Sequence, residues 1–92
     1  MKLSQKSILA NIATLPNWAL SGNVIASNFR FTDFVAAMRF VNRVAKLAEA
    51  VNHHPDITIR YNRVRLALTT HDEGGLTDKD FKLARKINKL AK

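Results

Sequence analysis

The alternation of hydrophobic and polar residues predicts two pairs of strands and three helices. Residues 4–13 carry apolar side chains at helical spacing, and Ser4 is suited to be the N-cap of that helix. Strands are predicted over residues 17–21 and 24–31, where apolar residues alternate with others. Gly22-Asn23 between them is a turn signal, so the two strands should form a hairpin.

A long amphipathic helix is predicted between the two strand pairs. Apolar residues recur at three- and four-residue steps from Phe34 to Val51, which corresponds to about five turns of 3.6 residues. We expect Thr32 to cap this helix, with Asp33 in its first turn. The helix should end before Pro55, because the residue before a proline avoids the α region.

A second strand pair and a final helix complete the predicted order. Strands are expected over residues 57–61 and 64–70, with a turn at Asn62-Arg63 and a loop over residues 72–75. Thr77 should open the last helix. The order α-β-β-α-β-β-α predicts an α+β fold: a four-stranded antiparallel sheet with three helices packed on one face. We expect residues 1–92 to form a single domain.

Composition limits the possible catalytic chemistry and indicates the cellular compartment. The chain has no cysteine, which excludes disulfides and thiolate catalysis. No apolar run approaches the roughly 20 residues of a membrane span, and Asn11 interrupts the apolar residues near the start, unlike a signal peptide. We therefore expect a cytoplasmic protein that has no membrane partner.

The net charge of +8 raises the question of an acidic partner such as nucleic acid. Aromatic residues are not interleaved with the basic ones in a stacking pattern. The basic residues of the last helix are typical of a solvated face. A nucleic-acid partner is therefore not expected, although a basic nucleic-acid-binding protein stays an alternative function.

Three histidines carry the candidate chemistry. His53 and His54 stand at the predicted end of the long helix, and His71 stands at the end of the last strand. No metal site is expected, because adjacent histidines rarely point at one ion and no spaced carboxylates complete a ligand set. Histidine has an unperturbed pKa of about 6.5, which suits general acid–base catalysis near neutral pH.

An ordered set of motifs resembles the pterin-4a-carbinolamine dehydratase family. The set spans roughly residues 15–90 and consists of Trp18-x-Leu20, Glu49-x-x-x-His53-His54-Pro55, Tyr61-Asn62-x-Val64, Leu68-x-Thr70-His71 and Gly75-Leu76-Thr77-x-x-Asp80. The resemblance implies a dehydratase that removes water from 4a-hydroxytetrahydrobiopterin to give the quinonoid dihydropterin. Such an enzyme recycles the cofactor of aromatic amino-acid hydroxylases. It uses the pterin as substrate, needs no cofactor or metal, and forms homodimers or homotetramers.

The resemblance also assigns roles to residues. His53 and His71 match the catalytic pair, and Asp80 matches an acidic residue that orients a catalytic histidine. Residues matching substrate-binding positions are His54, Trp18, Glu49 and Pro55. Which histidine is the acid and which is the base stays open.

Structural roles compete with these assignments at several positions. Thr77-x-x-Asp80 has the spacing of a capping box, so Asp80 could serve the helix, the site or both. Glu49 is equally suited to be a solvated helix residue, and Trp18 to be part of the core.

A non-catalytic dimerisation or transcriptional coactivator-type module is the other alternative function. We expect its oligomer surface on the uncovered sheet face, at Thr58, Arg60, Arg65, Ala67 and Thr69.

Overall fold

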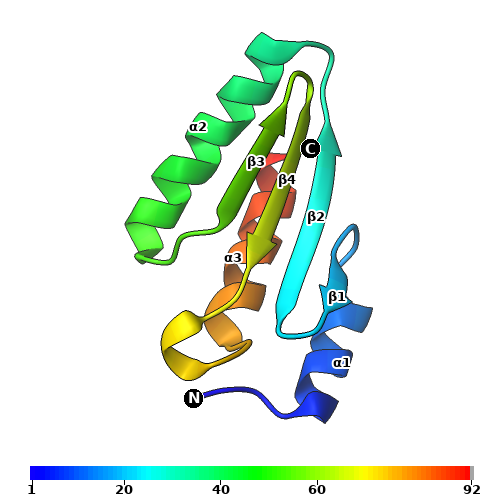
Figure 1. Cartoon of the computed structure of the whole chain (residues 1–92), viewed down its shortest axis with the longest axis vertical. Helices are drawn as coiled ribbons and strands as arrows, with labels where there is room; N and C mark the ends of the chain where they lie inside the picture. Colours follow the sequence, from blue (N-terminus) through cyan, green and yellow to red (C-terminus); the bar gives the residue numbers. More distant parts are fainter. Residues whose placement is uncertain (92) are drawn as a thin grey trace.

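A four-stranded antiparallel sheet of order β1-β2-β4-β3 organises the fold. The computed structural model describes residues 1–91 (Figure 1). The elements follow the order α1 (Gln5–Ala13), β1 (Ala19–Ser21), β2 (Val24–Arg30), α2 (Phe34–Val51), β3 (Asp56–Arg60), β4 (Arg63–Leu68), a 3-10 helix (His71–Glu73) and α3 (Asp78–Leu90). The predicted α+β class and element order are confirmed.

The core lies between the sheet and the helices. Every second residue of the central strands is buried, including Ile25 and Phe29 on β2 and Leu66 on β4. These side chains pack against Phe40 of α2 and Phe81 of α3. Among residues 1–91, no helix combines the length and the apolar character needed to cross a membrane.

Several predicted boundaries are wrong by one or two residues. Strand β1 begins at Ala19 rather than at residue 17, β2 ends at Arg30 rather than at residue 31, and β3 covers Asp56–Arg60 rather than residues 57–61. The N-cap of α2 is Asp33 rather than Thr32: its Oδ1 accepts a hydrogen bond from the Ala36 backbone N–H at 2.9 Å. A carboxylate there also faces the positive end of the helix dipole. The turn after β3 consists of Tyr61 and Asn62 rather than Asn62 and Arg63, because Arg60 and Arg63 already pair across the hairpin.

The expected loop over residues 72–75 is partly helical, and strand β4 is shorter than predicted. β4 ends at Leu68, and His71–Glu73 form a 3-10 turn. Thr70 and Gly75 pair through two backbone hydrogen bonds of 3.2 and 3.3 Å, which close this turn into a loop between β4 and α3. His71 is therefore carried on a closed turn instead of at a free strand end.

Candidate active site

The end of α2 directs His53 toward α3. Asn52 adopts a left-handed conformation with φ 52° and ψ 45°, which asparagine tolerates better than most residues. The His53 N–H donates to Ala48 O, and the Asn52 N–H donates to Glu49 O. These two bonds form a Schellman-type ending, which reverses the chain after the helix. His53 consequently points back into the molecule.

His53 is bound to a fully buried carboxylate. Its Nε2 lies 2.5 Å from Oδ1 of Asp80, in the first turn of α3. The Asp80 side chain is 0% exposed, and that of His53 is 12% exposed. A contact this short in a nearly dry position is a charge-assisted hydrogen bond that fixes the orientation of the imidazole ring.

Asp80 serves the helix cap and the histidine together. Its Oδ2 accepts hydrogen bonds from the Thr77 backbone N–H at 2.9 Å and from the Thr70 hydroxyl at 2.8 Å. The predicted capping box between Thr77 and Asp80 is therefore present. Because its other oxygen binds His53, the carboxylate has three partners in all.

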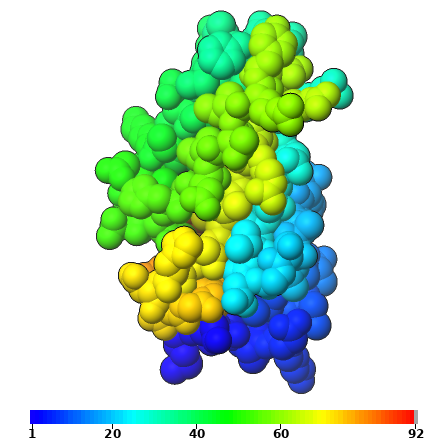
Figure 2. Space-filling model, in the orientation of Figure 1, coloured from blue at the N-terminus to red at the C-terminus, as the bar shows by residue number. Residues whose placement is uncertain are grey.

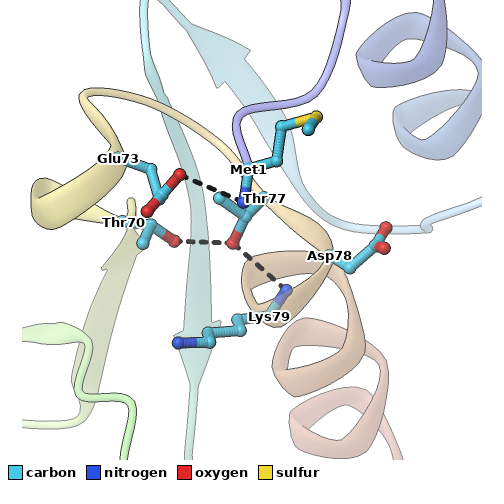
Figure 3. A pocket seen from close by; sticks show the side chains of 6 residues that line it. All are labelled: Met1, Thr70, Glu73, Thr77, Asp78 and Lys79. Carbon is cyan, nitrogen blue, oxygen red and sulfur yellow. Dashed lines mark hydrogen bonds and ion pairs between the residues drawn. The ribbon is translucent and has the colours of Figure 1, made fainter.

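Two threonine hydroxyls behind Asp80 have determined directions. Thr70 and Thr77 lie 2.8 Å apart at their Oγ1 atoms (Figure 3). A hydroxyl has one proton, and Thr70 gives its proton to Asp80, so Thr77 must donate to Thr70. Thr77 Oγ1 in turn accepts from the Lys79 backbone N–H. Every polar group behind His53 is thus satisfied by a partner.

This network selects the tautomer of His53. The Asp80 carboxylate accepts hydrogen bonds, so the proton of the neutral imidazole resides on Nε2. Within residues 1–91, every buried side-chain nitrogen or oxygen has a hydrogen-bond partner. Nδ1 of His53 has no such partner among these residues, so it is not buried and is in contact with solvent. Nδ1 is therefore the ring nitrogen that is free to accept a proton from outside this network.

The three histidines meet at one open cleft of about 400 Å³. It lies between the end of α2 and the turn after β4, and its lining residues are Asn52, His53, His54, Thr69, Thr70, His71, Asp72 and Lys79. His54 is exposed, and its Nε2 contacts Oε2 of Glu49, one turn back on α2. Pro55 is half-buried and follows the pair.

The chain start holds the turn that carries His71. Leu3 N–H donates to Leu76 O at 2.9 Å, and the Met1 amino group lies 3.0 Å from Glu73 Oε1 (Figure 3). A Cβ added to Gly75 would come within 2.7 Å of the Lys2 side chain, so glycine permits this close approach. The imidazole of His71 itself is exposed and makes no side-chain hydrogen bond within residues 1–91.

Trp18 is not brought to the cleft. It is 6% exposed and packs edge-on against Phe29 in the core. Its Nε1 donates to Oδ1 of Asn88 at 2.9 Å. Asn88 is eight residues beyond Asp80, which is about 12 Å along a helix. The structure thus places Trp18 in the core, near the far end of α3.

Three residues at the site were not among the site residues predicted from the sequence. Thr70 and Thr77 complete the Asp80 network, and Lys79 lines the cleft although it had been assigned to the solvated face of the last helix. Only Thr77 had a usable signal, the capping-box spacing. In residues 1–91, no group of three or more His, Cys, Asp or Glu side chains is arranged to hold a metal ion.

Comparisons with known proteins agree on one family. The family model described as Pterin 4 alpha carbinolamine dehydratase matches residues 1–90. A protein of Chloroflexus aurantiacus, provisionally named a pterin-4-alpha-carbinolamine dehydratase, is 57% identical over 89 residues, covering 97% of this chain and 96% of its own. A protein of Acidobacterium capsulatum with the same name is 56% identical over 89 residues, covering 97% of each chain.

Solved structures support the same relationship. A protein described as a transcriptional coactivator/pterin dehydratase from Brucella melitensis has a TM-score of 0.95 and 36% identity, with both chains covered completely. A pterin dehydratase-like protein described as a RuBisCO assembly factor of the alpha-carboxysome has a TM-score of 0.66 and 20% identity, over 80% of this chain and 86% of its own. The second likeness concerns the fold alone.

Proposed function

The chain belongs to the Pterin 4 alpha carbinolamine dehydratase family, and we propose that it dehydrates 4a-hydroxytetrahydrobiopterin at the histidine cleft. The pterin is the substrate, and the reaction needs no further cofactor. The product is the quinonoid dihydropterin, so the enzyme would recycle the cofactor of aromatic amino-acid hydroxylases. The observation that carries the proposal is the buried Asp80 carboxylate behind His53, in a cleft that also holds His54 and His71.

The reaction requires one acid and one base. The bond between C4a and the hydroxyl oxygen breaks, and the oxygen takes a proton from the acid and leaves as water. The base removes the proton from the adjacent ring N–H, whose electron pair forms the new carbon–nitrogen double bond. One proton is given and one is taken, so solvent exchange restores both groups.

We assign the base to His53 and the acid to His71. When Nδ1 of His53 takes a proton, the ring becomes an imidazolium that is bonded to the Asp80 carboxylate. This carboxylate stabilises the charged form and holds the ring in position, as in other His–Asp pairs. His71 also lines the cleft, on the turn after β4, and its side chain is exposed to solvent.

His54 and Glu49 are proposed to bind the substrate. Their side chains are 53% and 78% exposed and contact each other at the rim of the cleft. A pterin has ring N–H and carbonyl groups that such a pair could contact. Pro55 would fix the backbone after His54, because its ring restricts φ. A contact between Trp18 and the pterin of the same chain has no support in this geometry.

The direct test is a coupled assay. A phenylalanine hydroxylase reaction supplies the carbinolamine, and the formation of quinonoid product is followed with and without the protein. We expect acceleration over the spontaneous rate, and much less acceleration from His53→Ala and His71→Ala. Lys46→Ala, on the outer side of α2, is the matched control and should keep full activity. Absence of acceleration by the wild-type protein would refute the proposal.

We also propose that the chain forms homo-oligomers, but through a different surface from the one first expected. The uncovered sheet face carries arginines, which would repel the same face of a second copy. Strand β3 is at the edge of the sheet, and Ile57 and Ile59 are 36% and 37% exposed there. Light scattering should show a dimer or tetramer. Ile57→Lys/Ile59→Lys should reduce the mass, and an unchanged mass would exclude this edge.

An interaction role without catalysis is the alternative. It is favoured by the description of the Brucella melitensis relative as a coactivator as well as a dehydratase. An inactive but oligomeric wild-type protein would support this alternative, whereas acceleration of the coupled reaction would establish catalysis.

A further inference from the structure

The sheet face turned away from the helices carries a row of three arginines. Arg63 of β4 pairs with Arg30 of β2 on one side and with Arg60 of β3 on the other. Directly opposed residues in antiparallel strands have Cα atoms about 4.5–5.5 Å apart and point to the same face. All three side chains are exposed, so three arginines occupy directly neighbouring positions across three strands.

A fourth arginine extends this row. Arg65 lies two residues further along β4 and therefore faces the same side as Arg63. A hollow of about 290 Å³ lies here, lined by Asn28, Thr58, Arg60, Arg63, Val64 and Arg65. Figure 2 shows this side of the molecule, where β2 and β4 form the surface and no helix covers them. We call Arg30, Arg60, Arg63 and Arg65 the arginine face.

The charges of the arginine face are not compensated by carboxylates of residues 1–91. In the part of the chain that the structure describes, none of the four makes an ion pair with a carboxylate within 4.0 Å. Asp56 is on the same face but pairs with Ala67, near the other end of β4. Like charges directly opposite one another destabilise a sheet. This arrangement therefore has an energetic cost in folding that an anionic ligand would offset.

The face has few of the features of a protein interface. Such an interface has an apolar, aromatic-rich centre that is depleted of charge. Here the centre is charged, and the uncharged neighbours are small or polar, as Asn28, Thr58 and Ala67 are. Guanidinium groups are suited to bind phosphate oxygens through two parallel hydrogen bonds.

An exposed aromatic residue stands at the end of the row. Tyr61 follows Arg60 in the hairpin turn and is 66% exposed. A hollow at this end is lined by Arg60, Tyr61, Asn62 and Arg63. Basic residues along the path of a sugar–phosphate backbone, together with an aromatic ring on which a base can stack, are typical of proteins that bind single-stranded nucleic acid.

From this geometry we propose that the arginine face binds single-stranded nucleic acid, with its phosphates on the arginines and a base on Tyr61. The function goes beyond the proposed dehydratase activity and uses none of its residues. A nucleic-acid strand that lies across the row would cross three β-strands, a distance of about 10 Å at the usual spacing of β-strands. The net charge of +8 would accelerate association with such a polyanion.

The test measures binding of the full chain to a fluorescein-labelled 20-nucleotide single strand of mixed sequence, as DNA and as RNA. Fluorescence anisotropy is recorded from 50 to 200 mM salt. We expect the triple variant Arg30→Gln/Arg60→Gln/Arg63→Gln to bind at least about 10-fold more weakly at 100 mM salt. Its slope of log K against log salt should fall by about 2, since each phosphate contact contributes about 0.7.

A matched control removes the same charge from another surface. Arg39→Gln/Arg43→Gln/Lys46→Gln also lowers the net charge by three, on the exposed outer side of α2. It should weaken binding less than about 3-fold. An equal loss in both triple variants, or no binding by the wild-type chain at 50 mM salt, would overturn the proposal.

Two further measurements test base stacking on Tyr61 and the alternative that the face binds an acidic protein. Tyr61 has φ 52°, so Tyr61→Asn keeps a residue that tolerates this conformation. It should weaken binding about 10-fold without changing the salt slope, and an unchanged affinity would remove Tyr61 from the site. Poly-L-glutamate should not displace the strand at equal charge concentration. Equal displacement would overturn the proposal in favour of an acidic protein partner.

The thermal stability of the arginine-face variant provides the internal check. The arginine-face triple variant should melt at the wild-type temperature or above, because like charges have been removed from opposed positions. Weaker binding together with a lower melting temperature would count against the proposal, since partial unfolding would then account for the loss.

Discussion

Nε2 of His53 and Oδ1 of Asp80 lie 2.5 Å apart and join the end of α2 to the first turn of α3. Residues 27 positions apart in the sequence thereby form one unit with a defined proton position. The same carboxylate caps α3, so the helix start and the orientation of the histidine depend on one side chain.

Asp80→Asn is expected to lower kcat by about 10- to 100-fold with little change in KM, because Asp80 acts through His53. The variant should also lose about 1–3 kcal/mol of stability, since an amide cannot accept all three hydrogen bonds. The coupled assay and thermal unfolding measure the two effects.

Thr77→Ala is the control for loss of the cap, and it also removes the hydrogen bond between Thr77 and Thr70. It removes a side-chain cap worth about 0.5–2 kcal/mol but leaves the contact between His53 and Asp80 in place. Its kcat should therefore fall far less than that of Asp80→Asn. Equal losses of kcat at equal stability would mean that Asp80 acts only through folding.

His53→Gln should separate structure from chemistry at the histidine. The glutamine amide can donate to Asp80 as Nε2–H does, but it cannot transfer a proton. We expect stability near the wild type and activity near the spontaneous rate. His53→Ala should lose the same activity and, in addition, about 1–3 kcal/mol, because Asp80 is left with an unpaired buried oxygen. Substantial turnover by His53→Gln would exclude proton transfer by this residue.

Glu49→Ala and His54→Ala should change substrate binding more than stability. The pair is exposed, and surface ion pairs typically contribute about 0–1 kcal/mol. Both variants should raise KM by several-fold while the melting temperature changes little. A wild-type KM in both would indicate that this pair is only a feature of the helix end.

Trp18→Phe distinguishes a core residue from a substrate contact. The change removes the hydrogen bond to Asn88, which we expect to cost about 1–2 kcal/mol, while the ring still fills the core. Activity per folded molecule should stay at the wild-type level. A raised KM in a fully folded variant would instead support a substrate contact, for instance in an oligomer.

Local patterns were sufficient to predict the element types but not all boundaries. Apolar residues alternate over residues 24–31 and recur every three or four residues in α2. These periods show which side chains are buried, whatever the element packs against. The N-cap of α2 was misassigned because Thr32 and Asp33 both cap helices well. The contact between Asp33 and Ala36 decides between them. The turn at Tyr61 was missed because a tyrosine with positive φ is uncommon.

The candidate site was only partly predictable for a similar reason. Pro55 is a sequence signal for the end of the long helix, and the histidines are a chemical signal. Thr70 belongs to one of the motifs, but nothing in the sequence indicates that its hydroxyl contacts Asp80. Its contact with Asp80 depends on where β4 ends relative to α3, which involves residues ten positions apart.

The sequence by itself determined the class of the fold, the order of its elements, the family and the set of titratable residues, because these depend on local periodicity and on residue types in order. Tertiary structure alone decided which atoms meet. In it, Nε2 of His53 donates a hydrogen bond to Asp80, and Trp18 lies in the core away from the cleft. Arg30, Arg60 and Arg63 are neighbours across three strands. Strand register and helix packing set these contacts, and both are fixed only when the whole core forms.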